Sequence, residues 1–353
     1  MPEISSTGPR ELHFTRTNGA VDTAIDHLIG LVGGIDRPRY VREMILAAMK
    51  AGQEDEDDRV DLKMMNHTLK EMRFTAKVFA PYHHVRKVSV FGSARVPPGD
   101  PRYQLARALG KRLAKDGFMV ITGGGPGIMQ AANEGAGPEA SFGINIQLPF
   151  EQRPNPVVEG NPRSVNYKYF FNRKVAFLKE ADAVVLLPGG FGTLDEGMEA
   201  LTLMQTGKHN PIPIVMLDLP EGRYWKDWKA FIATQMVASG YVDARDLELV
   251  AHHNDPQAVV DHILRFYSRY HSLRYVGDKL VLRLTRALSS GQVADLAAGF
   301  SDMLLPGGGI TAGSALPEEK DSAALKELPR LIIDFDRRHF ARLHQLIDCI
   351  NGL

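Results

Sequence analysis

The chain of 353 residues is 44% hydrophobic, which is enough to bury a substantial core and, at this length, to form two or three structural units. Lys and Arg together number 42, as do Asp and Glu, so the balanced charge supplies no overall field that would attract nucleic acid or anionic lipid. The single cysteine, Cys349, excludes an intramolecular disulfide and a multi-cysteine metal site, and we interpret it as a small apolar residue buried in the last helix.

The first part of the chain predicts helices. Its N-terminus lacks the apolar segment of a secretion signal, and no apolar run approaches the roughly 20 residues of a membrane span, so we expect a cytoplasmic protein. Between residues 21 and 80, apolar side chains recur at spacings of three and four, as at Ile25, Leu28, Ile29 and Val32. We therefore predict that residues 1–85 form a helical extension.

From residue 86 the chain alternates short β-branched runs with amphipathic segments of helical length. The predicted strands are KVSVFG, FMVITG, FGINIQLP, AVVLLP and IPIVMLD, and the predicted helices cover about 101–116, 126–136, 167–180, 193–206 and 223–238. Regular alternation implies crossover connections, and hence a parallel sheet with helices on both faces. We predict an α/β fold, a doubly wound parallel sheet, as the domain of residues 86–270.

After residue 271 this alternation ends. The segment SLRYVGDKLVLRL predicts a β-hairpin that turns at Gly277 and Asp278, and a helix is expected near 290–304. A loop rich in Gly and Ser over 306–323 leads to the strand RLIIDF and a terminal helix over 338–350. Residues 271–353 are therefore predicted to form a small α+β domain.

Three of the predicted strands end in turns of small residues. These turns are FGSAR at 91–95, TGGGPGIM at 122–129 and PGGFGT at 188–193. Glycine has no Cβ, so backbone N–H groups can approach a ligand closely, and a helix that begins at the turn adds the positive end of its dipole. Because ligands bind at the carboxyl ends of parallel strands, the sequence predicts that all three turns face one crevice that binds phosphate.

Two common nucleotide-binding patterns are absent from these turns. The first turn reads GSARVP rather than G-x-G-x-x-G, and the chain has no G-x-x-x-x-G-K-[ST] loop. A nicotinamide or nucleoside-triphosphate enzyme is therefore disfavoured, and we expect no cofactor and no metal. A second Pro-Gly-Gly segment, LLPGGGI at 304–310, has no Thr or Glu behind it, so we predict an ordinary turn there.

Glu196 and Arg173 are the candidate chemical groups. From spacing alone, Glu196 has two interpretations of about equal weight: the third residue of a helix that Thr193 caps, or a carboxylate one helical turn from a bound phosphate. Arg173 precedes Glu196 by one helix and one strand, which can return its helix to the crevice beside the glycine turn. The alternative for Arg173 is a solvated side chain on an amphipathic helix.

These residues resemble the LOG family, nucleoside 5′-monophosphate phosphoribohydrolases that are often labelled lysine decarboxylases. The resemblance covers roughly residues 86–270 and rests on GSAR, TGGGPGIMQAANEGA, GINIQLPFEQRPN, YFFNRKVAFLKEADAVVLLPGGFGTLDE and ALTLMQTGK. The family signature, an R-K pair followed by P-G-G-x-G-T-x-x-E, is complete here. It implies a Rossmann-like fold for this region.

The resemblance also assigns roles to single residues. Arg173 and Glu196 become the catalytic pair, and Gly190, Gly192 and Thr193 become phosphate ligands. The further substrate-binding candidates are Lys174 and Thr202, Glu151 as the acid that short family members place in this region, and the turn residues Ser93, Gly124, Gly125, Gly189 and Phe191.

The expected reaction is hydrolysis of the N-glycosidic bond of a nucleoside 5′-monophosphate, AMP-like or a cytokinin riboside monophosphate, to free base and ribose 5-phosphate. Glu196 suits the stabilisation of an oxocarbenium-like sugar and the activation of water, and Arg173 suits the orientation of the nucleotide. A protein that binds or senses a nucleotide without hydrolysing it is the alternative. A pyridoxal-dependent decarboxylase ranks third, because the turns do not resemble what that cofactor needs.

We expect a homodimer or larger homo-oligomer, with no nucleic-acid or membrane partner. The segment YKYFFNRKVAFL is aromatic around much of its helix, more than the cover of one sheet face requires, and the family that it resembles is dimeric through the corresponding helices. The competing explanation is that the N-terminal helices cover the same face within one chain.

Overall fold

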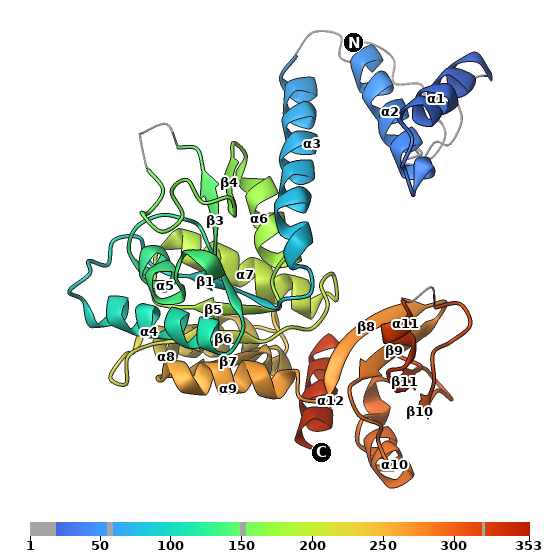
Figure 1. The fold of residues 1–353 in the computed structure, drawn as a ribbon. Coiled ribbons are helices and arrows are strands. Elements are labelled where there is room, and N and C mark those ends of the chain that lie inside the picture. Colours follow the sequence, from blue (N-terminus) through green and yellow to red (C-terminus); the bar gives the residue numbers. More distant parts are fainter. Residues whose placement is uncertain (1–18, 55–58, 149–152, 320–321) are drawn as a thin grey trace. The chain divides into compact units, whose positions relative to one another are not determined.

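The computed structural model describes residues 19–54, 59–148, 153–319 and 322–353 (Figure 1). The chain divides into two compact units, Met1–Lys70 and Glu71–Leu353. The domain boundaries expected after residues 85 and 270 stay predictions. Within the described ranges, no helix is both long and apolar enough to cross a membrane.

The first unit is helical, as predicted. It holds α1 (Gly19–Val32), α2 (Pro38–Glu54) and the first half of α3 (Arg59–Phe79). Arg42 of α2 donates a hydrogen bond of 3.2 Å to Asp22 of α1 and also pairs with Asp26. Ile25 and Leu46 are buried, so α1 and α2 are joined by a small apolar contact and by one shared cation.

The second unit is built on a parallel sheet of seven strands in the order β4-β3-β2-β1-β5-β6-β7. The strands are β1 (Lys87–Phe91), β2 (Met119–Thr122), β3 (Ser141–Ile146), β4 (Ser164–Tyr167), β5 (Ala183–Leu186), β6 (Ile214–Leu217) and β7 (Val250–His253). The strands β2, β3 and β4 are added in turn on one side of β1, and the chain then crosses to the other side, where it adds β5, β6 and β7. The strand order therefore reverses between β1 and β5. Ligands of doubly wound sheets bind at this point.

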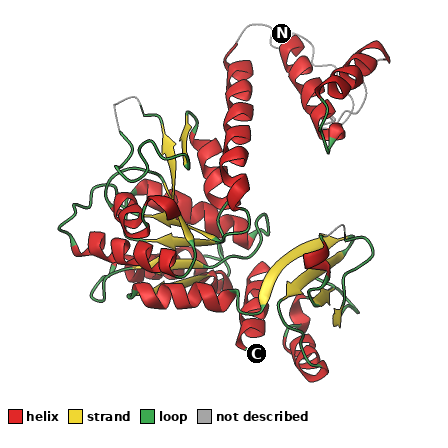
Figure 2. Ribbon diagram, in the orientation of Figure 1, coloured by secondary structure: helices red, strands yellow, loops and turns green. Residues whose placement is uncertain are grey.

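Helices cover both faces of the sheet (Figure 2), as the alternation of strand and helix predicted. The helices between and beyond the strands are α4 (Pro101–Lys115), α5 (Ile128–Ala136), α6 (Phe170–Lys179), α7 (Phe191–Gln205), α8 (Tyr224–Phe231) and α9 (Pro256–Phe266). Along β5, Ala183 and Val185 pack with α4, α5 and α9, whereas Val184 and Leu186 pack with α6, α7 and α8. Alternate side chains of one strand therefore enter two separate cores, which confirms the doubly wound fold.

Local capping explains where two of these helices begin. The carboxylate of Asp100 accepts a hydrogen bond from the Arg102 N–H at the start of α4, and Asp255 accepts one from the Ala258 N–H at the start of α9. A proline follows each cap, where its missing N–H costs nothing. Short connections thus become sharp helix starts on one face of the sheet.

The end of α3 belongs to the sheet unit and supports α6. Glu71 accepts hydrogen bonds from the Lys168 N–H (2.7 Å) and from the Asn172 side chain (2.6 Å), both at the start of α6. Further along α3, the ring of Phe79 stacks on Phe142 of β3, with ring centres 4.2 Å apart. The helix that carries Arg173 is therefore held from outside as well as by the sheet.

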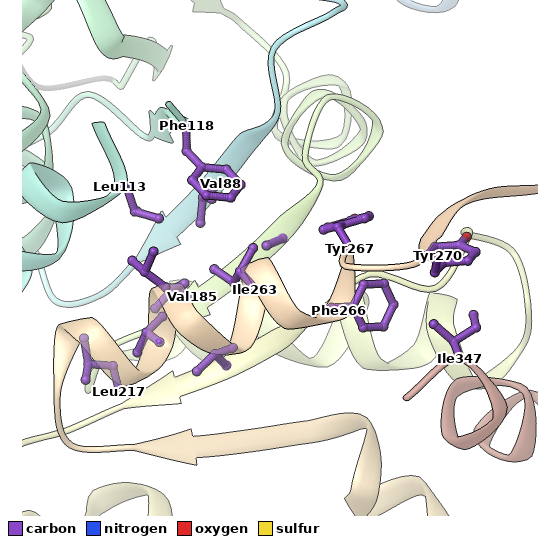
Figure 3. Close-up of a cluster of buried hydrophobic side chains, with 14 of the residues drawn as sticks. Val88, Leu113, Phe118, Val185, Leu217, Ile263, Phe266, Tyr267, Tyr270 and Ile347 are labelled. Atoms are coloured by element: carbon purple, nitrogen blue, oxygen red, sulfur yellow. The ribbon is translucent and has the colours of Figure 1, made fainter. Parts of the chain in front are cut away.

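A second, antiparallel sheet of four strands follows, in the order β10-β11-β9-β8. Its elements are β8 (Tyr270–Val276), β9 (Lys279–Leu284), α10 (Ser290–Gly299), β10 (Ile310–Gly313), α11 (Ala323–Lys326), β11 (Arg330–Ile333) and α12 (Phe340–Gly352). The predicted hairpin is confirmed, because Val276 pairs with Lys279 around the turn. One apolar core runs from Val88 and Val185 through Phe266 of α9 to Ile347 of α12 (Figure 3).

Helix α12 also packs against the far end of α7. Gly207, just beyond α7, has φ +65°, and a Cβ placed there would lie 2.0 Å from the ring of Phe340. Only glycine suits that backbone conformation and that contact together. The last helix of the chain is thus seated on the end of the helix that carries Glu196.

Three strands, two helices and one side chain differ from the sequence prediction. The helices α9 and α11 were not among the predicted helices. The strands β4, β7 and β10 were not predicted, since each is a four-residue strand at an edge of its sheet with little of the β-branched texture that marks the central strands. Cys349 is exposed on α12, not buried, because it stands beside Asp348 on the solvent side of that helix.

Candidate functional site

A cavity of about 730 Å³ lies at the carboxyl ends of β1, β2 and β5. Residues from all three predicted turns line it: 91–95, 123–125 and 189–193. These strands are neighbours in the sheet order, and β1 and β5 flank the point where that order reverses. The fold therefore brings the three small-residue turns to the position where doubly wound sheets bind ligands.

The second turn is shaped by a buried polar network. Gly124 has φ +69°, and a Cβ there would lie 1.7 Å from the side-chain oxygen of Asn145. Its N–H donates to the hydroxyl of Thr122 (3.0 Å), which in turn donates to Asn133 (2.7 Å). Because the Gly124 N–H and the Thr122 hydroxyl have partners inside the protein, this turn is held by its own chain.

Asn155 extends that network to the segment that begins at Arg153. Its side chain donates to the carbonyl of Gly125 (3.1 Å) and to Asn133 (3.1 Å), and its N–H donates to the carbonyl of Gly124 (2.7 Å). Asn155 is buried, and Arg153, two residues before it, lines the cavity. One asparagine thus fixes this segment against the glycine turn.

The third turn contains two kinds of glycine. Gly189 is closely packed, because a Cβ there would lie 2.1 Å from the Thr193 hydroxyl oxygen and 3.0 Å from the Ser93 nitrogen. Gly190 and Gly192 are open, since a Cβ at either position would meet nothing within 4 Å. Gly189 therefore shapes the turn, whereas the other two leave room for a ligand against the backbone.

The start of α7 corrects the capping expected for Glu196. The helix begins at Phe191 with Gly190 as its N-cap, so Thr193 is the third helical residue and not the cap. Glu196 then lies in the second helical turn of α7, beyond the position from which its side chain could complete a capping box. The first N–H groups of a helix have no partner within it, so α7 presents donors and a positive dipole end to the cavity.

Glu196 is a buried carboxylate in the cavity wall, with 4% of its surface exposed. Burial raises its pKa, because the charged form loses hydration, while the charges of Lys174 and Arg173 act in the opposite direction. An acid held in this way suits a chemical role better than a solvated one, since its protonation state depends on a few neighbours.

Arg173 reaches the same cavity from α6. Its guanidinium carbon lies 4.9 Å from the ring centre of Phe170 and 5.4 Å from that of Phe177. Its Nε is buried and has no hydrogen-bond partner within the described ranges, and burial lowers its pKa. A cation with an unused donor, stacked between aromatic rings at a cavity wall, is well placed to receive an anion.

The structure brings most of the predicted site residues together. Those that line the cavity are Ser93, Gly124, Gly125, Arg173, Gly189, Gly190, Phe191, Gly192, Thr193 and Glu196. Thr202 is exposed further along α7, where its hydroxyl donates to the Met198 carbonyl. Lys174 pairs with carboxylates of α7 instead of lining the cavity, and Glu151 lies outside the described residues.

Sequence reasoning did not name several other residues of the wall. Arg95 and Arg153 add two cations to the charge of Arg173, and Asn145 and Met129 complete the wall. Arg95 stands in the GSAR turn, so the turn pattern already carried its signal. Arg153 stands in no motif that the sequence marks, and no spacing rule places it. Among the described residues, the cavity wall has three arginines and one glutamate, a balance that favours an anionic ligand.

Residues 115–263 match the family model described as "Possible lysine decarboxylase". The "Probable cytokinin riboside 5'-monophosphate phosphoribohydrolase" LOGL5 of Oryza sativa subsp. japonica is 33% identical over 165 residues, 44% of this chain and 63% of that protein. The cytokinin riboside 5′-monophosphate phosphoribohydrolase of Rhodococcoides fascians is 27% identical over 150 residues, 42% of this chain and 74% of that protein. Over this part of the sequence the chain is similar to phosphoribohydrolases of the LOG family.

The similarity covers one part of the chain. This chain covers less than two thirds of the first rice relative, and more than half of its own length lies outside that alignment. Among solved structures, a molybdenum cofactor binding protein from Rippkaea orientalis is 21% identical, covers 51% of this chain and 95% of its own, and has a TM-score of 0.36.

Proposed function

We propose that this protein hydrolyses the N-glycosidic bond of nucleoside 5′-monophosphates to a free base and ribose 5-phosphate. The observation that carries the proposal is the buried carboxylate of Glu196, which shares one cavity wall with the open glycines of the third turn. A phosphate at the start of α7 and a carboxylate one turn further along fit the two ends of a ribose 5-phosphate unit.

Glu196 is assigned to the reacting sugar. As the bond between C1′ and the base nitrogen breaks, positive charge develops on the ring oxygen and C1′, and a carboxylate beside the ring stabilises it. Glu196 also takes a proton from water as the water oxygen bonds to C1′, and the departing base takes up a proton. One water is consumed, and the products are the base and ribose 5-phosphate.

Arg173 is assigned to the nucleotide's negative charge. A guanidinium stays protonated at neutral pH, so it orients the substrate and stabilises departing charge and does not transfer a proton. Phe170 and Phe177 fix its plane, and its buried Nε gains a partner when an anion binds. The 5′-phosphate, held by the N–H groups of Phe191 and Gly192 at the start of α7, places C1′ beside Glu196.

A discriminating experiment compares AMP, a cytokinin riboside 5′-monophosphate and adenosine, with release of the free base followed by chromatography. We expect base release from one or both monophosphates and a loss of at least about 100-fold in kcat/KM for adenosine, which lacks the anchoring phosphate. AMP binding measured by calorimetry without base release from either monophosphate would overturn the hydrolase proposal. It would favour a protein that senses nucleotides.

We also propose that the protein is a homo-oligomer that packs through α6. Phe170, Phe171 and Val175 of α6 are 52%, 46% and 48% exposed, beside the cavity that Phe170 itself lines. Apolar side chains gathered beside a site are a liability in solvent and are commonly covered by a second copy. Light scattering at low micromolar concentration is expected to give at least twice the chain mass of 39.0 kDa. A single species of 39.0 kDa that still releases base would contradict the proposal.

A further inference from the structure

Lys174 of α6 is surrounded by carboxylates of α7. Its ammonium nitrogen lies 2.8 Å from Asp195, 3.3 Å from Glu196 Oε2 and 2.9 Å from Glu199. Of these three acids, Glu196 lines the cavity. The resemblance to the LOG family assigned Lys174 to the substrate, but its donors are directed to the helix that carries the acid.

The three carboxylates explain why a cation is needed at this position. They stand within five consecutive residues of one helix, and like charges at such spacings repel each other. An ammonium group has three N–H donors, and this one has three acceptors within reach, so a single lysine offsets the repulsion. Because Lys174 donates to Glu196 Oε2, the other carboxylate oxygen of Glu196 is the one left to contact a ligand.

We propose that Lys174 is a positioning residue, which holds Glu196 Oε2 so that the carboxylate stays ionised and offers its other oxygen to the sugar, and that Lys174 does not itself contact the nucleotide. This inference rests on the proposed function of Glu196. It separates the two members of the adjacent basic pair, because Arg173 faces the ligand and Lys174 faces the acid.

The charges around Glu196 set the direction of the effect. Lys174 and Arg173 face it from α6, and Asp195 and Glu199 flank it on α7; Arg95 and Arg153 stand in the same cavity wall. Burial raises the pKa of Glu196, and Lys174 is the first of the groups that lower it. Burial would lower the pKa of Lys174, but its hydrogen bonds to Asp195 and Glu199 raise it overall, so Lys174 is a permanent cation at neutral pH.

The test uses two variants of Lys174 and a control on the same helix. Lys174→Met keeps the length of the side chain without its charge, and Lys174→Arg keeps the charge. Lys179→Met removes an exposed lysine of α6 that pairs with Glu180, outside the cavity wall. For each variant, kcat and KM for the hydrolysed monophosphate are measured from pH 5 to pH 9.

In Lys174→Met we expect the acidic limb of the pH profile of kcat to move to higher pH by about one unit or more, since a cation within 4 Å of the Glu196 carboxylate is lost. KM should change by less than about threefold, because no substrate contact is removed. In Lys174→Arg the acidic limb should lie close to its wild-type pH, and Lys179→Met should have the wild-type pH profile. A rise of about tenfold in KM with an unmoved limb would overturn the proposal and make Lys174 a substrate contact.

A second measurement separates this proposal from the proposed function. The pKa of Glu196 is followed by NMR of protein labelled with ¹³C in the glutamate carboxyl groups, and the signal is assigned with Glu196→Gln. Lys174→Met should raise that pKa whether or not the wild type hydrolyses a nucleotide. An unchanged pKa in folded Lys174→Met would contradict the positioning role, whereas base release that is absent from the wild type contradicts only the hydrolase.

Discussion

The chain contains the segment Leu-Leu-Pro-Gly-Gly twice, at 186–190 and at 304–308, and the structure uses the two copies differently. In the first copy, Gly190 caps a helix of 15 residues, and space above Gly190 and Gly192 opens into the cavity. The second copy enters a turn that leads into the four-residue strand β10. The same five letters therefore build either a ligand cradle or a connection.

The turn at 304–310 already contains an anion from its own chain. The carboxylate of Asp334 accepts a hydrogen bond from the Gly309 N–H (3.1 Å) and pairs with Lys279. A Cβ on Gly308 would lie 2.5 Å from the Cβ of Asp334, so side chain and turn are in close contact. A glycine turn becomes a site for an external anion only where the protein does not supply an internal one.

The largest expected effect concerns Glu196, the residue that follows the first copy and has no counterpart after the second. We expect Glu196→Gln to lower kcat by about 10³-fold or more while KM for the monophosphate changes little. Steady-state kinetics and calorimetric binding of AMP measure the two effects. Glu221→Gln, an exposed glutamate outside the cavity wall, is the control and should retain the activity.

The stability of Glu196→Gln follows from the sign of its pKa shift. Burial raises the pKa of Glu196 in the folded state, so this group favours folding below its unfolded pKa and loses that contribution as pH rises through the folded value. At pH 7 the Gln variant should therefore melt no lower than the wild type. Near-wild-type turnover at an unchanged melting temperature would remove Glu196 from the chemistry.

Arg173 is expected to show the next largest effect. Arg173→Ala should lower kcat/KM by about 100-fold or more, because the charge on the ligand loses its planar donor. The stability loss should stay near 1 kcal/mol, the contribution of its contacts with Phe170 and Phe177. Urea unfolding and kinetics are measured on the same preparation. If the variant precipitates or unfolds, Arg173 is a structural residue.

A matched pair of glycine substitutions compares the two turns directly. An added methyl group meets nothing within 4 Å at Gly192 or at Gly309, so both variants should fold. We expect Gly192→Ala to raise KM for the monophosphate about tenfold, because the methyl group enters the space beside the phosphate donors. Gly309→Ala should leave kinetics unchanged. Equal effects of the two variants would mean that the turns do not differ in function.

The smallest expected effect is on the free energy of unfolding, through Asp334 at the turn of residues 304–310. Hydrogen bonds from Lys279 and the Gly309 N–H lower the pKa of Asp334, so its contribution is present above its unfolded pKa and is lost as pH falls through the folded value. Asp334→Asn should cost about 1 kcal/mol at pH 7 and less at pH 3, as measured by urea unfolding. Base release should not change. A loss that persists undiminished at pH 3 would contradict an ionic role.

The sequence predicted the sheet and the position of the crevice because both depend on local patterns. β-branched runs such as AVVLLP form central strands whose two faces are buried, and glycine turns after them meet at one edge of the sheet. The four-residue strands β4 and β7 could not be predicted from the sequence, since they form strands through pairing with a neighbour and not through the preferences of their own residues.

The start of α7 and the partners of Lys174 could not be predicted from spacing. Thr193 looks like a helix cap in the sequence, but in the structure Gly190 takes that place and the helix begins at Phe191. Lys174 pairs with Asp195, Glu196 and Glu199 only because α6 and α7 lie side by side on one face of the sheet. Contacts of this kind depend on tertiary packing, which a linear pattern does not record.

The contact between Gly207 and Phe340 joins two segments that are 133 residues apart in the chain: Gly207 lies inside the range 115–263 that the family model matches, and Phe340 lies beyond it. A side chain larger than hydrogen at 207 is excluded while the ring occupies 340, and a smaller residue at 340 would leave a hole beneath the helix end. The two positions are therefore constrained to change together. The matching region of a relative, transplanted into this chain, would need glycine at that position before it could accept this C-terminal helix.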